Sequence, residues 1–308
     1  LYCSAKLSLV WMLNREEKMK KILGIALGLS VVLTGCSKPE APTTDATKTD
    51  TAAAEQTVTI ASTGSDADIW RHIATLPETK AAGLKLDIKN FTDYVAMNTA
   101  VANNEVDVNA FQSYAYLVAY NEANTAKIAP LSTTYLEPMG IYSSKVKTLA
   151  EFKNGATIAI PNDGANESRA LLLLQSAGLV KLKNDFDFVK GTSKDIVENN
   201  KALVIKPIQM ATAVRVKDEV DAIVLGNTLA MEGGLNVLKD AIYYEPIDQT
   251  TKMNVNVLAV AEARQNDPVL KKVGELYHVA AVGKYVQEHF GGTKIDVNKP
   301  VSYLTQAK

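Results

Sequence analysis

The chain from residue 58 onward alternates short apolar runs with longer amphipathic stretches. Short apolar runs indicate strands, and amphipathic stretches with a period of about 3.6 residues indicate helices. The first part of this region is expected to hold strands at 58–61, 84–89 and 106–110 and helices at 66–82 and 93–103. Ser65 or Asp66 is the expected cap of the first helix. This order of elements predicts a parallel sheet covered by helices.

A second unit of the same order follows along the chain. It is expected to hold strands at 156–160, 202–208 and 220–225 and helices at 166–177 and 209–217. The sequence Glu-Val-Asp-Val at 105–108 is echoed by Glu-Val-Asp-Ala at 219–222, and both follow an amphipathic helix. Two related lobes explain this echo, although unrelated helix–turn–strand junctions can also look alike.

The last part of the chain is expected to return to the first lobe, with a strand at 255–260 and a long helix at 268–288. The chain would then cross between the lobes near 137–143 and near 254–260. The predicted fold is α/β, with one lobe of residues 58–137 plus 256–308 and another of residues 138–255. Sheets of this kind bind ligands at the carboxyl ends of their strands, so a cleft between the lobes is the expected site.

The first 36 residues have the order of an export signal. Basic residues at 19–21 precede an uncharged apolar run at 22–33, which is too short to span a bilayer. The run ends in the sequence Leu-Thr-Gly-Cys at 33–36, which looks like the lipobox of bacterial lipoproteins. We expect residues 1–35 to be removed and Cys36 to carry lipid, including palmitate. The alternative is a buried helix that ends at an incidental cysteine.

The residues on either side of this signal are not expected to fold. Residues 1–18 fit no part of a signal peptide, and the purine-rich codons of the Arg-Glu-Glu at 15–17 point to a translated ribosome-binding site before a start at Met19. Residues 36–57 begin with the lipidated cysteine and are rich in Thr, Ala and Pro, without large apolar side chains. They are expected to form a flexible tether that spans roughly 25 Å.

Composition excludes several classes of function. Residues 1–35 hold five basic and two acidic residues, so the 33 basic and 34 acidic residues of the whole chain become 28 and 32 in the mature chain, a net charge of −4. No basic stripe is present, which argues against a nucleic-acid partner. Cys3 is lost with the signal and Cys36 is lipidated, so the folded part has no thiol or disulfide.

The residues that follow the predicted strands are the candidates for the cleft. They are Ser62, Thr63 and Gly64; Phe91 and Tyr94; Asn109, Phe111, Gln112 and Ser113; Asn162, Asp163 and Gly164; and Gly226, Asn227 and Thr228. The set is polar, aromatic and mostly uncharged. Such residues suit recognition of a ligand better than catalysis.

Arg169 is the most informative single residue. It is predicted to lie in the first turn of a helix opened by Asn166, where free backbone N–H groups favour anions. An arginine at this position adds a bidentate donor for a carboxylate. The alternative is a surface arginine paired with Glu167 or Asp163.

Tyr94 and Phe111 are candidates for an apolar wall around a ligand side chain, with ordinary core packing as the alternative. The tyrosines at 114, 116 and 120 are expected on a helix surface or in packing between the lobes.

Catalysis finds little support in the sequence. The histidines at 72, 278 and 289 are far apart, and Asp66 and Asp68 are spaced for a helix start and not for a metal. The motifs H-E-x-x-H, G-x-S-x-G and the P-loop do not occur. We therefore expect no catalytic residue, no metal and no cofactor.

Several motifs together resemble the NlpA/MetQ-type methionine-binding lipoproteins of ABC importers. They are Phe-Thr-Asp-Tyr-Val at 91–95, Asp-Val-Asn-Ala-Phe-Gln at 107–112, Glu-Pro-Met-Gly-Ile-Tyr-Ser at 137–143, Pro-Asn-Asp at 161–163 and Arg-Ala-Leu-Leu-Leu-Leu-Gln at 169–175, followed by Gly-Leu. The resemblance covers the chain from residue 58 to its end, together with the lipobox. It implies a two-lobed periplasmic-binding-protein fold of type II and the capture of a free amino acid.

Carried over residue by residue, the resemblance implies ligand contacts from Tyr94, Phe111, Arg169 and Asn256. In the family the arginine holds the ligand carboxylate and the aromatic residues enclose the side chain. The chain departs from the family pattern at Ser113, where the family usually has His, and at Glu137, where family members have Tyr. A family Asn that contacts the ligand aligns with Gly226, so that Asn227 is one place off.

The expected function is that of a lipid-anchored substrate-binding protein, which delivers methionine or a related small amino acid to an ABC permease and its ATPase. The protein is expected to be a monomer, held at the cell membrane through Cys36 and facing the periplasm or the cell exterior. One alternative is an adhesive or signalling lipoprotein that no longer serves transport. Another is an enzyme on the same fold, which would need a nucleophile or a perturbed carboxylate pair in the cleft.

Overall fold

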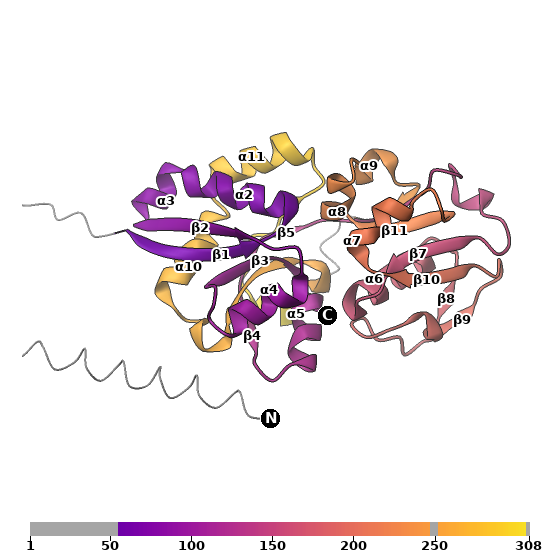
Figure 1. Ribbon diagram of the computed structural model, residues 1–308, viewed down its shortest axis with the longest axis horizontal. Helices are drawn as coiled ribbons and strands as arrows, with labels where there is room; N and C mark the ends of the chain where they lie inside the picture. The colour runs from indigo at the N-terminus through magenta and orange to yellow at the C-terminus, as the bar shows by residue number, and fades with distance from the viewer. Residues whose placement is uncertain (1–54, 247–251, 306–308) are drawn as a thin grey trace, which may run out of the picture. The chain divides into compact units, whose positions relative to one another are not determined.

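A computed structural model of the chain describes residues 55–246 and 252–305. The expected signal peptide, the lipidation site at Cys36 and the expected tether up to residue 54 lie outside these ranges. Within the two ranges, no helix combines the length and the apolar composition needed to cross a bilayer. The described residues form two α/β lobes, each with a five-stranded sheet (Figure 1).

The sheet of the first lobe takes strands from both ends of the described region. Its order is β2 (Leu84–Asn90), β1 (Gln56–Ser62), β3 (Val108–Ser113), β13 (Asn256–Ala261) and β4 (Ile128–Thr133). β1 is parallel to β2 and β3, whereas β13 is antiparallel to both β3 and β4. The chain thus returns from the second lobe to fill a place between two earlier strands.

Helices cover both faces of this sheet. One face packs against α2 (Gly64–Thr75), α10 (Pro268–Leu276) and α11 (Ala280–Phe290), with α3 (Pro77–Ala81) beside them. The other packs against α4 (Tyr94–Ala102), α5 (Tyr114–Ala123) and α12 (Ser302–Thr305). Along β13, Leu258 and Val260 join the first core, and Val257 and Ala259 join the second. Because both faces are buried, β13 appears in the sequence as a continuous apolar run from Val257 to Ala261.

The sheet of the second lobe has an equivalent arrangement. Its order is β10 (Val204–Ile208), β7 (Thr157–Pro161), β11 (Ala222–Gly226), β6 (Met139–Tyr142) and β12 (Tyr243–Tyr244). β7 is parallel to β10 and β11, and β6 is antiparallel to β11. One face packs against α6 (Gly164–Ser176), and the other against α7 (Met210–Ala213), α8 (Asn227–Glu232) and α9 (Val237–Asp240). In both sheets the fourth strand is the antiparallel one.

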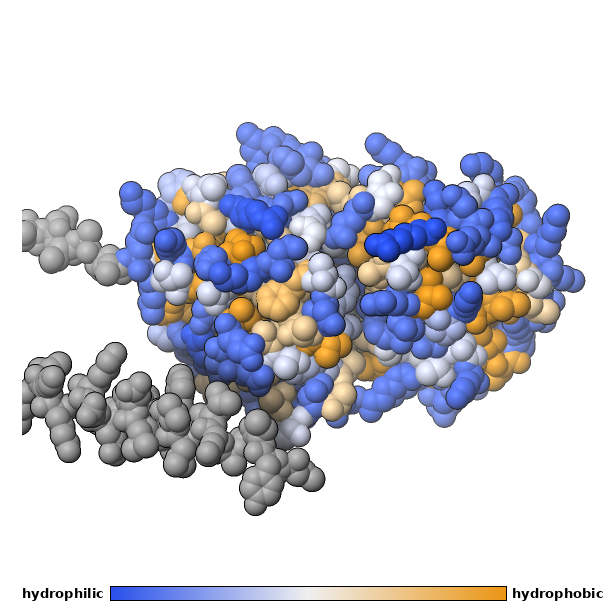
Figure 2. Space-filling view, viewed as in Figure 1, coloured by the Kyte–Doolittle hydropathy of each residue, from blue (hydrophilic) through white to orange (hydrophobic). Residues whose placement is uncertain are grey.

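Shorter elements complete the described residues. Two small sheets pair β5 (Tyr135–Leu136) with β14 (Ile295–Asp296) and β8 (Lys181–Leu182) with β9 (Ile196–Glu198). The 3₁₀ helices are η2 (Leu149–Glu151), η3 (Ser193–Asp195), η4 (Val214–Val216), η5 (Lys252–Asn254) and η6 (Glu262–Arg264). On the face drawn in Figure 2, hydrophilic residues surround smaller hydrophobic areas.

The expected α/β fold with two lobes is confirmed, but several helix predictions were wrong in detail. The predicted helix 66–82 is broken at Leu76, which is extended because Pro77 follows it and opens α3. The predicted helix 268–288 consists of two helices, α10 and α11, with Val279 extended between them. The predicted helix 209–217 is a single turn, α7, continued by the 3₁₀ helix η4.

The starts of two helices also differ from the prediction. α2 begins at Gly64 after Thr63, so neither Ser65 nor Asp66 is its cap. α6 begins at Gly164, and the carboxylate of Asp163 caps it by accepting a hydrogen bond from the backbone N–H of Asn166. Both helices therefore start two residues before the predicted position, which shifts every later residue along the helix.

Candidate ligand-binding site

A pocket lies where residues that follow the strands of both sheets meet. Six of the seven residues predicted to bind ligand line it, namely Tyr94, Phe111, Ser113, Glu137, Arg169 and Asn256. Its cavity of about 60 Å³ is several times the space of roughly 10–15 Å³ that one water molecule needs. Its walls come from β3, α4 and α5 of the first lobe and from α6 and α8 of the second. The predicted residues therefore converge on one place, with Asn227 as the exception.

Arg169 reaches this pocket from the second turn of α6 and not from the first. The leucines at 171 and 174 of the same helix fill the core of the second lobe, which fixes the helix on its sheet. Arg169 is 8% exposed, and its Nε donates to Glu245 Oε1 at 2.8 Å and Oε2 at 3.1 Å. Its Nη2 donates to Glu245 Oε2 at 2.5 Å and to the carbonyl oxygen of Glu137 at 2.7 Å. The alternative of a surface arginine paired with Glu167 or Asp163 was wrong.

The electrostatics around Arg169 keep it charged. Burial alone would lower the pKa of its guanidinium, but the charge and hydrogen bonds of Glu245 and the charge of Glu137 raise that pKa above the ordinary value. Nε and Nη2 are both used, whereas Nη1 has no hydrogen-bond partner among the described residues. Nε and Nη2 thus hold the guanidinium in place, and the two N–H groups of Nη1 remain as donors for an anion.

Three aromatic side chains form one wall of the pocket. The rings of Tyr94 and Phe111 lie 5.0 Å apart between centroids, and Tyr116 stands edge-on to them at 6.2 and 5.7 Å. Burial, followed by the charge of Glu232, raises the pKa of Tyr94, so its hydroxyl stays protonated. Tyr116 was predicted to lie on a helix surface or in packing between lobes, and the structure corrects this because it lines the pocket.

A buried amide network supports this wall from behind. Gln112 lines the pocket, and its Nε2 donates to Asn98 Oδ1 at 2.7 Å and to Asn109 Oδ1 at 2.8 Å. Asn98 Nδ2 donates back to Gln112 Oε1 at 2.9 Å. Asn98 and Asn109 are fully buried, so a network in which each amide has a partner holds the end of β3 rigid.

Asn256 and Ser113 lie opposite each other at the start of β13 and the end of β3. Asn256 is 5% exposed, and its side-chain amide makes no hydrogen bond with the described residues. Ser113 caps α5, and its hydroxyl accepts a hydrogen bond from the backbone N–H of Tyr116 at 3.3 Å. Asn256 is therefore the freer of the two to bind a ligand.

Asn227 lies behind the pocket and contacts it through Glu137. It is fully buried at the start of α8, and its Nδ2 donates to Glu137 Oε2 at 3.0 Å and to Thr293 Oγ1 at 3.1 Å. Its Oδ1 has no partner among the described residues. The amide thus supports Glu137 at a cost of about 1–3 kcal/mol for its own unpaired oxygen.

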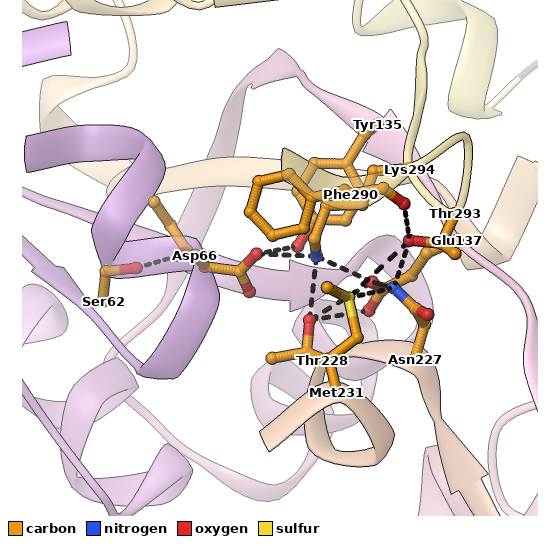
Figure 3. Close-up of polar contacts among 11 residues, drawn as sticks. Ser62, Asp66, Tyr135, Glu137, Asn227, Thr228, Met231, Phe290, Thr293 and Lys294 are labelled. Atoms are coloured by element: carbon orange, nitrogen blue, oxygen red, sulfur yellow. Dashed lines mark hydrogen bonds and ion pairs between the residues drawn. The ribbon is translucent and has the colours of Figure 1, made fainter. Parts of the chain in front are cut away.

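A buried ion cluster lies beside Glu137, and the sequence did not reveal it (Figure 3). Lys294 Nζ contacts Asp66 Oδ1 at 2.9 Å, Glu137 Oε2 at 2.7 Å and Thr228 Oγ1 at 2.9 Å. Its charge also lies over the ring of Tyr135, 4.1 Å from the centroid. Asp66 comes from α2, Thr228 from α8 and Glu137 from the segment between β5 and β6, so Lys294 joins both lobes to the connection between them.

The pKa shifts in this cluster follow from burial and charge. Burial lowers the pKa of Lys294, but Asp66 and Glu137 together raise it above the ordinary value. Burial raises the pKa of Glu137, but the charge and hydrogen bond of Lys294, the hydrogen bond of Asn227 and the charge of Arg169 together outweigh burial, and the net pKa is lowered. For Asp66 burial prevails and the pKa is raised. One ammonium group thus stabilises two buried carboxylates, and it stabilises Glu137 more fully.

The histidines lie away from the pocket. His72 and His289 both stack on Tyr285, at 4.1 and 3.9 Å between ring centroids. His278 bonds through Nδ1 to Asp296 and through Nε2 to the carbonyl oxygen of Thr133. Residues 55–246 and 252–305 contain no group of three or more His, Cys, Asp and Glu side chains placed to hold a metal ion.

The two α/β lobes and the pocket between them define a substrate-binding protein of the periplasmic-binding-protein type. Residues 58–298 match the model of the NlpA lipoprotein family, and the chain belongs to that family.

Relatives and solved structures of similar proteins agree with this assignment. The chain is 35% identical to outer membrane lipoprotein 2 of Mannheimia haemolytica over 89% of this chain and 97% of that protein. It is 33% identical to a probable D-methionine-binding lipoprotein MetQ of Pasteurella multocida, over 89% and 98%. The structure of a nutrient-binding protein from Burkholderia cenocepacia bound to methionine is 33% identical and superposes with a TM-score of 0.74, covering 78% of this chain and 99% of that one.

Proposed function

We propose that this protein is the lipid-anchored substrate-binding component of an ABC importer and that it binds methionine or a related small amino acid between its lobes. The observation that carries the proposal is the position of Arg169, a buried guanidinium whose Nη1 has no partner among the described residues, in a pocket that also has an aromatic wall. A free amino acid offers a carboxylate to the first and an apolar side chain to the second. The relatives named for methionine binding support the same ligand class.

In this proposal each predicted residue has a role. Arg169 binds the ligand carboxylate through Nη1, and Asn256 donates or accepts a hydrogen bond next to it. Tyr94 and Phe111 enclose the ligand side chain, whose burial contributes about 1.5–3 kcal/mol. Ser113 and Glu137 shape the pocket, and Asn227 acts through Glu137 and not by contact with the ligand.

The lipid on Cys36 gives the binding protein its location. The predicted tether of residues 36–57 is too long by two residues, because Gln56 and Thr57 belong to β1. A signal sequence of residues 1–35 and this tether would keep the lobes at the outer face of the cell membrane or in the periplasm. Such a position suits delivery of a captured amino acid to a permease and its ATPase. The protein needs no cofactor for this role, and a monomer with one pocket can perform it.

Isothermal titration calorimetry tests the binding step. The mature lipoprotein is purified in detergent, unfolded and refolded to remove any bound ligand, and titrated with each of the twenty common amino acids. We expect one or a few of them, with methionine among them, to bind with a Kd of about 1 μM or tighter, or about −8 kcal/mol. Absence of heat with all twenty would contradict the proposal.

A matched pair of variants tests the role of Arg169. Arg169→Lys keeps the charge but loses the planar fork, so binding is expected to weaken by about 100-fold. Arg215→Lys changes an exposed arginine of the same lobe and should leave affinity unchanged.

Delivery is tested separately by uptake of the labelled ligand in cells that lack the gene. Normal uptake would favour an adhesive or signalling role.

A further inference from the structure

Asp66 places a carboxylate oxygen without a protein partner at the pocket. The residue is 3% exposed and lines the same cavity as Arg169. Its Oδ1 accepts hydrogen bonds from Tyr135 Oη at 2.6 Å and from Lys294 Nζ at 2.9 Å. Figure 3 shows these bonds converging on one oxygen of the carboxylate, and Oδ2 has no hydrogen-bond partner among the described residues. Because Asp66 lines the cavity and its Oδ2 is not among the fully buried unpaired atoms, this oxygen is open to a ligand that enters the cavity.

The other charged groups of the cluster are already occupied. Lys294 has three N–H donors, and they point to Asp66, Glu137 and Thr228. Both oxygens of Glu137 accept hydrogen bonds, Oε2 from Lys294 and Asn227 and Oε1 from Thr228. Lys294 therefore has no donor left for a ligand carboxylate, and Glu137 is poorly placed to accept an additional donor.

The charges around the pocket do not balance. Lys294 and Arg169 carry two positive charges, whereas Asp66, Glu137 and Glu245 carry three negative charges when ionised. Arg169 is paired with Glu245, so Lys294 is the one cation in ion-pair contact with Asp66 and Glu137 among the described residues, although the charge of Arg169 also acts on Glu137. A buried site with one excess negative charge favours a ligand that brings a cationic group to it.

We propose that Asp66 binds the ammonium group of the ligand through Oδ2, while Arg169 binds its carboxylate. Lys294 and Tyr135 are positioning residues in this assignment, because they hold Oδ1 and so direct Oδ2 to the cavity. The assignment rests on the proposed function, since it concerns the recognition of a free amino acid. It goes further by making the unmodified amino group a requirement for binding.

Two features make Asp66 a better acceptor than a surface carboxylate would be. Lys294 also lies over the rings of Tyr135 and Phe290, so the cation that holds Asp66 is itself fixed between two aromatic faces. Asp66 lies near the start of α2, where Gly64 has a φ of +45° and allows the Glu232 carboxylate of α8 to approach closely. A side chain at residue 64 would have to displace the end of the Glu232 side chain, and the positive φ of Gly64 is itself a conformation that favours glycine.

The experiment compares two ligands on three proteins by calorimetry. The ligands are methionine and 4-(methylthio)butanoic acid, which is methionine without its amino group. The proteins are the refolded mature lipoprotein, its Asp66→Asn variant and a control, Asp68→Asn. Asp68 lies on the same helix but is exposed and paired with Arg71. We expect Asp66→Asn to weaken methionine binding by about 10- to 100-fold, as for loss of a charged hydrogen bond.

The deaminated acid separates recognition from a structural effect. It is expected to bind the wild-type protein at least about 10-fold more weakly than methionine and to lose nothing further in Asp66→Asn. Equal losses for both ligands in Asp66→Asn would overturn the assignment, because they would show a structural role. Equal affinity of the two ligands for the wild-type protein would also overturn it, even if the variant does not fold. Absence of heat for all amino acids with wild-type protein would instead refute the proposed function itself.

Discussion

Arg169 and Glu245 form a buried ion pair in which both oxygens of the carboxylate face Nε of the guanidinium, at 2.8 and 3.1 Å. Glu245 Oε2 also accepts a hydrogen bond from the backbone N–H of Met139 at 2.8 Å, at the start of β6. The pair therefore joins α6 to the segment by which the chain enters the second lobe. It fixes the direction of the guanidinium before any ligand arrives.

Replacement of Glu245 by Gln should destabilise the protein by about 3 kcal/mol, because it leaves the charge of Arg169 buried without a partner. Urea unfolding of the refolded protein measures this loss. The variant should also gain more stability from ligand than the wild type does, since the ligand carboxylate replaces the missing anion. Glu198→Gln breaks only the exposed pair with Lys181 and should cost less than about 1 kcal/mol. Equal effects of the two substitutions would refute the role of the buried pair.

Replacement of Asn256 by Ala should weaken ligand binding by about 10- to 100-fold, the cost of one hydrogen bond to a charged ligand group. The free energy of unfolding without ligand should change little, because the Asn256 amide has no partner among the described residues. Asn236→Ala should show the opposite pattern. Asn236 caps α9, so its loss should cost about 1 kcal/mol of stability without any change in affinity. Calorimetry and urea unfolding on both variants separate the two effects.

Replacement of Lys294 by Met should lower the free energy of unfolding by about 3–5 kcal/mol, because two buried carboxylates lose their cation. Addition of Asp66→Asn to this variant should recover part of the loss, since one of the two charges is then removed. A double-mutant cycle in urea measures the coupling, expected at 1 kcal/mol or more in order of magnitude. Lys272→Met, at an exposed lysine of α10, is the matched control. Strictly additive effects would show that Lys294 and Asp66 do not interact.

Asp107 should make the stability of the first lobe depend on pH. Burial raises the pKa of Asp107, but hydrogen bonds from Arg264 and Thr59 outweigh burial and hold the pKa below its ordinary value of 3.8. Its stabilising effect is therefore complete above about pH 4 and is lost as the pH falls through the lowered pKa.

The Asp107→Asn variant tests this pH dependence. It should be about 1–2 kcal/mol less stable than the wild type at pH 7, and the difference should shrink below about pH 4. Asp87→Asn, which breaks an exposed pair with Lys89, is the control. A difference that stays constant down to pH 3 would contradict the assignment to Asp107.

The echo between residues 105–108 and 219–222 corresponds to a shared structural contact. Asp107 Oδ2 accepts a hydrogen bond from the backbone N–H of Thr59 at 2.8 Å, and Asp221 Oδ2 accepts one from Thr157 at the same distance. In the first lobe the aspartate just before β3 thus bonds to β1. In the second lobe the aspartate just before β11 bonds to β7. The short-range pattern was detectable because both strands are buried on two faces and the aspartate precedes each of them.

The helix breaks show what local patterns miss. Pro77 was a visible signal for the break at Leu76, and it was overlooked. The break at Val279 has no glycine or proline beside it. It coincides with contacts of His278 to Asp296 and to the carbonyl oxygen of Thr133, which are 18 and 145 residues away. Contacts of that range hold the backbone in a conformation that propensity alone does not predict.

Some residues of the pocket were predictable from the sequence, and others were not. Arg169, Tyr94 and Phe111 follow or lie near the ends of predicted strands, where parallel sheets bind ligands, and a family motif supported them. Lys294 was missed because it lies in a C-terminal segment after two glycines, and its partner Asp66 is 228 residues away. Charged pairs that far apart leave no periodic signal in a single sequence.

The strand order of the first sheet also constrains the sequence in which the protein can assemble. β13 lies between β3 and β4, yet it starts 143 residues after the end of β3 and 123 residues after the end of β4. The second sheet takes all five of its strands from one continuous segment, β6 to β12. As the chain emerges during synthesis, the second lobe can complete its sheet first, while the first lobe must wait for β13, the strand that pairs with β4. The ligand pocket, with walls from both lobes, is therefore the last part of the protein to form.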